Sequence, residues 1–272
     1  EPYPIDDWGV NSAKTTHLMT EAERRVYADR ATHLGDPDFI KVPTQMLTDS
    51  LYTVNRMKNF DETKATLSDS IQAGIFTGES DQTTHLSVVD KEGNAVSVTT
   101  TLNGGYGSMV IVDGSGFFLN NEMDDFSAKP GVPNMYGVIG GEANKILPQK
   151  RMLSSMTPTI VEKDGKLLMV VGTPGGSTII TSVFQTILNV IDHKMTMQEA
   201  VNAKRVHSQW FPDLVIPEFR AISTADSLAL VDMGHTFKSR RGIGRVDAIL
   251  IRADGKLEGG ADPRGDDTAE GY

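Results

Sequence analysis

Two β-rich runs separated by a short polar turn constrain the fold of this chain more than any other stretch. The first run covers residues 83–89 and the second covers 95–101, with charged residues, glycine and asparagine between them. Runs of this kind around such a turn predict a β-hairpin. Centring the turn on Glu92 pairs residues whose numbers sum to 184. This register predicts one apolar face (Leu86, Val88, Val96 and Val98) and one polar face (Thr83, His85, Ser87, Thr99 and Thr101).

The polar face places Thr83 opposite Thr101, and this pair is a candidate catalytic centre. A threonine hydroxyl needs a base, and cleavage of the chain just before Thr83 would free an α-amino group that can act as one. The Thr101 hydroxyl can hydrogen-bond the oxygen of such a nucleophile. Threonine is also a common strand residue, which is the structural alternative. The same Thr-Thr-His-Leu sequence occurs at 15–18, where Thr20 and Glu23 have capping-box spacing and predict a following helix.

The rest of the chain predicts a mixture of helices and strands. Residues 41–82 are mixed and polar, with an exposed loop at 74–82, and 127–147 form a long surface loop. Strands in hairpins flanked by helices indicate an α+β fold of mostly antiparallel sheets. Helices are predicted over 20–33, 179–191, from Thr196 and over 223–233, and strands over 109–112, 116–119, 159–162, 167–171 and around a turn at 254–255.

Two further motifs suggest binding chemistry. Gly175 and Gly176 lie between an apolar strand and a long helix, where backbone N–H groups can point at an oxyanion. The alternative is a tight turn that needs glycine. Residues 121–125 contain three carboxylates but lack the spacing of a calcium loop, and a solvated acidic turn is the alternative there.

Composition excludes several classes of protein. The formal net charge of −10 argues against nucleic acid and anionic membranes as partners. The absence of cysteine excludes disulfides and a thiolate nucleophile. No apolar window is long enough to span a membrane. The histidines are scattered without a ligand pair, so the sequence indicates neither a metal site nor a cofactor.

Thr83-Thr84-His85 followed by the hairpin resembles the start of the small subunit of γ-glutamyltranspeptidases, which are N-terminal-nucleophile hydrolases. The resemblance implies the four-layer αββα sandwich, with 1–82 as the C-terminal part of the large subunit and 83–272 as the catalytic small subunit. Family members carry a long stretch before such a segment, so we expect a partial sandwich here. Further segments match the family in order, at 34–39, 119–126, 129–134, 153–159, 172–177 and 262–264.

The resemblance also implies roles for individual residues. Thr83 is the nucleophile, Thr101 orients it, and Gly175 and Gly176 form the oxyanion hole. The family commonly has arginine where this chain has Thr178, and some relatives have glutamine at the position of Glu122. The resemblance implies that Asn103, which we expect on the strand face of Thr101, contacts substrate and that Glu122 and Asp125 bind its α-ammonium group. Ser154 and Ser155 are implied to bind the α-carboxylate, together with an arginine of the large subunit that we expect outside this chain. Tyr136 is implied to belong to a lid over 130–141.

The implied activity is γ-glutamyl transfer and hydrolysis through a γ-glutamyl-threonine ester, after autocatalytic cleavage before Thr83. The expected partners are glutathione and other γ-glutamyl compounds, amino acid or peptide acceptors or water, and the large-subunit segment that precedes this one in the family. The expected location is periplasmic or secreted. The alternatives are a glutaryl or cephalosporin acylase of the same fold and a non-catalytic fragment. The second alternative arises because the N-terminal half found in the family is expected to be missing here, so that this chain by itself would be poorly active.

Overall fold

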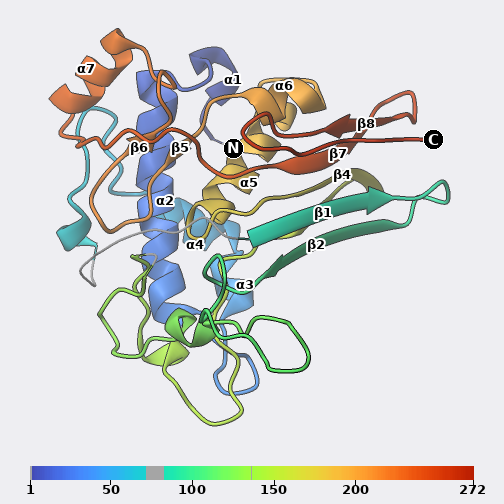
Figure 1. Ribbon diagram of the computed structural model, residues 1–272. Helices are drawn as coiled ribbons and strands as arrows, with labels where there is room; N and C mark the ends of the chain where they lie inside the picture. The colour runs from blue at the N-terminus through green and yellow to red at the C-terminus, as the bar shows by residue number, and fades with distance from the viewer. Residues whose placement is uncertain (1, 72–82, 136) are drawn as a thin grey trace.

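The structure is a computed structural model that describes residues 2–71, 83–135 and 137–272. One long helix, α2, runs along a layered body of strands and shorter helices (Figure 1). The helices are α1 (Ile5–Trp8), α2 (Ala13–His33), α3 (Thr44–Leu47), α4 (Ser50–Arg56), α5 (Thr178–Ile191), α6 (Met197–Asn202) and α7 (Thr224–Asp232), with short 3-10 helices η1 (Ser68–Ser70), η2 (Glu122–Asp125) and η3 (Glu142–Asn144).

The paired strands in the described residues are all antiparallel, as predicted. The first two strands form a hairpin, four others form a sheet in the order β3-β4-β7-β8, and a short pair forms a third unit. The strands are β1 (Thr83–Val89), β2 (Ala95–Thr101), β3 (Thr159–Lys163), β4 (Lys166–Gly172), β5 (Val206–His207), β6 (Ile216–Pro217), β7 (Asp247–Ile251) and β8 (Leu257–Gly260).

The four-stranded sheet is covered on both faces. Met169 and Val171 of β4 pack with Val183 of α5 and Met197 of α6 in one buried apolar cluster. Gly172 faces the opposite way, against the β1–β2 hairpin, because neighbouring residues of a strand point to opposite faces. The layers are therefore helices, sheet and hairpin, which is the arrangement expected for part of an αββα sandwich.

The register of the β1–β2 hairpin confirms the prediction, since Thr83 pairs with Thr101 and Leu86 with Val98. The polar face is the one that packs inward. Ser87 Oγ donates to the Asp247 carbonyl over 3.2 Å. A Cβ atom on Gly172 would lie only 2.1 Å from Cε1 of His85, so glycine is required where the hairpin meets the sheet.

The apolar face of the hairpin remains uncovered by the described residues. Leu86 is 57% exposed and Val96 is 50% exposed, and Val88 and Val98 are each 44% exposed. Monomeric proteins rarely leave a contiguous row of large aliphatic side chains in water. This face therefore has the character of a surface that another segment or chain covers.

The start of α2 differs from the prediction. The helix begins at Ala13 with Ser12 as its cap, whose hydroxyl accepts a hydrogen bond from the Thr15 N–H over 3.2 Å. The sequence at 15–18 thus lies within the helix, and Thr20 is a buried interior residue. Burial of this segment in the tertiary fold outweighs the local capping signal, which predicted a start near Thr20.

The other predicted elements mostly form. The capping box of α6 is present between Thr196 and Glu199, and Ser223 caps α7. The predicted strands at 109–112 and 116–119 are reduced to one bridge between Ile111 and Phe118. These two segments are not part of any of the three sheets, so no third strand stabilises their pairing. The loop predicted at 74–82 lies outside the described residues.

No helix in the described ranges is long and apolar enough to cross a membrane.

Candidate active site

The first residue of β1 and the last residue of β2 meet at the open end of the hairpin. The Thr83 hydroxyl donates to Oγ1 of Thr101 over 3.2 Å. The backbone N–H of Asn103 donates to the same oxygen over 2.9 Å. The Asn103 N–H thus polarises Thr101 Oγ1, which lies within hydrogen-bond distance of the Thr83 oxygen and can orient it. The register predicted from the sequence, which placed Thr83 opposite Thr101, is therefore confirmed.

Asn103 lies beyond the end of β2. The prediction that it shares a strand face with Thr101 assumed that the strand continues to residue 103, and this assumption was wrong. The strand β2 ends at Thr101, and Asn103 has a φ of 70°, which is left-handed backbone. It is nevertheless buried beside the threonine pair. Its side-chain amide donates to the Asn121 carbonyl over 3.3 Å and thereby joins the hairpin end to the acidic segment.

The acidic residues form the short helix η2, where Glu122 and Asp125 are partly buried rather than fully solvated. Burial raises the pKa of Glu122. Burial also raises the pKa of Asp125 to about 7, with a further increase from Glu122 and an opposing effect of Arg30. Two carboxylates that resist ionisation together favour a cationic ligand, because a positive charge would stabilise their charged forms.

Arg30 is a member of this site that the sequence reasoning missed. It projects from α2, is buried, and donates from Nη2 to the Ser155 hydroxyl over 3.1 Å and to the Ser154 carbonyl over 3.3 Å. A small cavity is lined by Arg30, Asp125 and Ser155 together. The structure thus brings Asp125 and Ser155, both predicted to bind substrate, to one cavity that the Arg30 side chain also lines. The bond between Arg30 and Ser155 joins residues 125 positions apart, so no local pattern could have revealed it.

The glycine turn connects β4 to α5. Gly175 has a φ of 143° and Gly176 a φ of 57°, so both residues adopt backbone conformations that favour glycine. Within the described residues their N–H groups donate to no other group. The Thr178 hydroxyl donates to the Gly175 carbonyl over 2.8 Å, so the residue that departs from the family pattern stabilises the turn.

The turn lies at the Thr83 end of the hairpin. Figure 1 shows β1 beginning, and β4 ending, at the side of the sheet where α5 starts. Contact between His85 and Gly172 fixes this arrangement. Tyr136 lies outside the described residues, so the predicted lid tyrosine stays a prediction.

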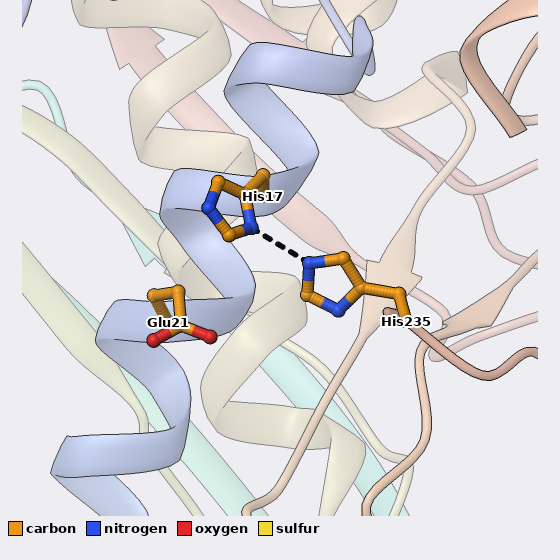
Figure 2. A group of neighbouring side chains, drawn as sticks. All are labelled: His17, Glu21 and His235. Carbon is orange, nitrogen blue, oxygen red and sulfur yellow. Dashed lines mark hydrogen bonds between the residues drawn. The ribbon is translucent and has the colours of Figure 1, made fainter. Parts of the chain in front are cut away.

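Figure 2 shows a second polar group, formed by His17, Glu21 and His235. A carbonyl can only accept, so Nε2 of His17 carries hydrogen and donates to the Asp61 carbonyl over 2.8 Å. Nδ1 of His17 then accepts from Nε2 of His235 over 2.7 Å.

The carboxylate of this group is also occupied, because Glu21 accepts from Arg25 over 2.7 Å and from the Thr66 N–H over 2.9 Å. Each of the three side chains is therefore already hydrogen-bonded, and two arginines adjoin the carboxylate. We treat the three residues as a buried hydrogen-bonded cluster and assign no metal to it. The sequence did not suggest it, because the histidines are 218 positions apart.

Comparison with known proteins gives consistent results. The family model described as gamma-glutamyltranspeptidase matches residues 1–272. The glutathione hydrolase proenzyme of Escherichia coli is 48% identical over 275 residues, covering 100% of this chain and 47% of that protein. The acylase ACY 1 proenzyme of Pseudomonas sp. (strain SE83) is 39% identical over 98% of this chain and 45% of that protein.

A solved structure of a mutant of Helicobacter pylori gamma-glutamyltranspeptidase matches with a TM-score of 0.65 and 51% identity. The match covers 67% of this chain and 100% of that one. This chain spans about half the length of the curated relatives it matches. The family model covers every residue of the chain, and the solved structure shares its fold. The chain therefore belongs to the gamma-glutamyltranspeptidase family.

Proposed function

We propose that this chain supplies the catalytic centre of an enzyme that transfers or hydrolyses γ-glutamyl groups of glutathione and related compounds. The observation that carries the proposal is the 3.2 Å pairing of Thr83 with Thr101 at the hairpin end, in a member of this family. The family relatives named as proenzymes support cleavage before Thr83, which would free the α-amino group that serves as base.

In the proposed acylation, the hydroxyl oxygen of Thr83 attacks the γ-amide carbon of the substrate while its α-amino group takes the proton. The N–H groups of Gly175 and Gly176 stabilise the oxyanion of the tetrahedral intermediate. The amide C–N bond then breaks, the amine leaves with the proton, and a γ-glutamyl ester remains on Thr83. Water or an acceptor amine attacks this ester and restores the hydroxyl.

Recognition of the substrate is proposed for the groups around the small cavity. Glu122 and Asp125 would bind the α-ammonium group, which would lower the raised pKa of Asp125 and favour its charged form. Ser154 and Ser155 would bind the α-carboxylate. Arg30 supports this role, because its bond to the Ser155 oxygen leaves the hydroxyl hydrogen free to point at an anion. Asn103 connects this region to the nucleophile, and Tyr136 is proposed to close over it.

We propose the large-subunit segment of the family as the partner that covers the apolar hairpin face. The exposed fractions of Leu86 and Val96 support this assignment, since burying such a row is strongly favourable. The division into a large-subunit part at 1–82 and a small subunit at 83–272 belongs to the same proposal. So does a periplasmic or secreted location, for which fractionation of the source cells is the test.

An acylase acting on glutaryl side chains is the second candidate, supported by the 39% identity to the acylase proenzyme. A glutaryl group has the carboxylate of a γ-glutamyl group but no ammonium. Two partly buried carboxylates, Glu122 and Asp125, favour the substrate that brings a positive charge. The γ-glutamyl activity is therefore the better fit.

The test compares a γ-glutamyl anilide with the matching glutaryl anilide on the complete protein. We expect kcat/KM to be at least tenfold higher for the γ-glutamyl compound, since a hydrogen bond to a charged group contributes about 1.5–3 kcal/mol. Thr83→Ala should abolish turnover. Thr100→Ala, on the opposite face of the same hairpin, is the matched control and should retain it. Preference for the glutaryl compound would favour the acylase, and turnover by Thr83→Ala would refute the proposed nucleophile.

A further inference from the structure

One phenol from α2 reaches the glycine turn. Tyr27 is only 3% exposed, and its hydroxyl donates to the Ser177 carbonyl over 2.6 Å. Ser177 directly follows Gly175 and Gly176 and directly precedes the first residue of α5. The two partners are 150 positions apart, so this contact is a tertiary connection between α2 and the proposed oxyanion hole.

The orientation of each N–H in the turn depends on the carbonyl before it, because the two groups share one planar peptide unit. The Pro174 carbonyl accepts from the Thr173 hydroxyl over 2.6 Å, which fixes the N–H of Gly175. The Gly175 carbonyl accepts from the Thr178 N–H over 3.0 Å, which fixes the N–H of Gly176. Both N–H directions are therefore determined by carbonyl partners, although glycine itself imposes little restraint.

Tyr27 fixes the donor that holds the Gly175 carbonyl, which is the N–H of Thr178. Its bond to the Ser177 carbonyl holds the peptide unit that contains the Thr178 N–H. That N–H in turn holds the Gly175 carbonyl, together with the Thr178 hydroxyl at 2.8 Å. Loss of the phenol would leave the first peptide of α5 held at fewer points, and the direction of the Gly176 N–H would become less defined.

We propose that Tyr27 is a positioning residue for the oxyanion hole. It fixes the peptide between Ser177 and Thr178, and through the Gly175 carbonyl it aims the N–H of Gly176. Preorganised donors contribute to catalysis only when they point at the position of the developing charge. This inference rests on the proposed function, since it assigns Gly175 and Gly176 to the oxyanion. Thr178 works on the same carbonyl and gives an independent way to test the relay.

The experiment uses Tyr27→Phe in the complete protein, with Tyr52→Phe as the matched control. Tyr52→Phe also removes a phenol beside α2, next to Asp29, and in the described residues no hydrogen bond joins its helix α4 to the glycine turn. We expect kcat for the γ-glutamyl anilide to fall about three- to tenfold in Tyr27→Phe, as for loss of one buried hydrogen bond. KM should stay within twofold, because ground-state binding uses other residues. Tyr52→Phe should retain the kcat of the parent protein.

Hydrogen exchange of the backbone amides over 175–179 provides a readout that needs no substrate. These amides should exchange faster in Tyr27→Phe than in the parent protein, and at the parent rate in Tyr52→Phe. Thr178→Val removes the second hold on the Gly175 carbonyl and should lower kcat in the same way. It also serves as the test variant if Tyr27→Phe folds poorly.

The two proposals fail in different ways. Parent protein that does not turn over the γ-glutamyl anilide would refute the proposed function, while the exchange rates would still decide the role of Tyr27. Unchanged kcat in Tyr27→Phe and Thr178→Val, or a change confined to KM, would overturn the positioning role. Unchanged exchange over 175–179 in Tyr27→Phe would overturn it as well.

Discussion

The burial of His235 beside His17 predicts how the unfolding free energy of the protein depends on pH. Burial, followed by the nearby His17 and Arg24, lowers the pKa of His235 from 6.5 to about 4. The unfolded chain therefore binds one more proton than the folded protein between these two pH values. Stability linked to His235 is fully present above pH 6.5, is lost as the pH falls towards 4, and changes no further below that value.

The magnitude follows from the size of the shift. A difference of about 2.5 pKa units corresponds to about 3 kcal/mol of unfolding free energy, or about 1.4 kcal/mol per pH unit within the window. His235→Gln keeps a donor for Nδ1 of His17 but cannot titrate. We expect its unfolding free energy to depend less steeply on pH, with a slope lower by about 1.4 kcal/mol per unit between pH 4.5 and 6.

Urea unfolding at half-unit pH intervals measures this slope in the parent protein and the variant. Phe60→Leu is the control, because Phe60 packs on the His17 ring at a centroid distance of 5.2 Å but carries no proton. It should lower stability about equally at every pH. Equal slopes for His235→Gln and the parent protein would refute the lowered pKa of His235.

Four further predictions concern the candidate site. Thr83→Ala should leave the complete protein uncleaved in intact-mass measurements, because the same hydroxyl would start cleavage; a normally cleaved variant would contradict this. Asp125→Ala should raise KM for γ-glutamyl anilide about 10- to 150-fold, the range for losing a hydrogen bond to a charged group, and an unchanged KM would return the acidic segment to a solvated turn. With a pKa of about 7, Asp125 should also make KM for this substrate rise below pH 7, since the protonated acid binds an ammonium poorly; a KM independent of pH would argue against it. Arg30→Met should raise KM more than it lowers kcat, and the opposite result would separate Arg30 from binding of the carboxylate.

The sequence predicted what depends on local pattern. The hairpin register, the capping box of α6 and the glycine turn before α5 all follow from residues close together in the chain. It did not predict which hairpin face packs inward, because that depends on His85 fitting against Gly172 of a distant strand. Arg30 and Tyr27 were missed for the same reason, since their partners are 125 and 150 positions away.

Helix α2 has a consequence for what happens after cleavage of the chain. It precedes Thr83, yet its buried side chains contact Ser177 through Tyr27 and Ser155 through Arg30. If the bond before Thr83 is cut as proposed, these two contacts would run between separate polypeptides. The product would be an obligate heterodimer in which neither piece contains a complete site, so that separating the chains abolishes activity even though every catalytic residue stays intact.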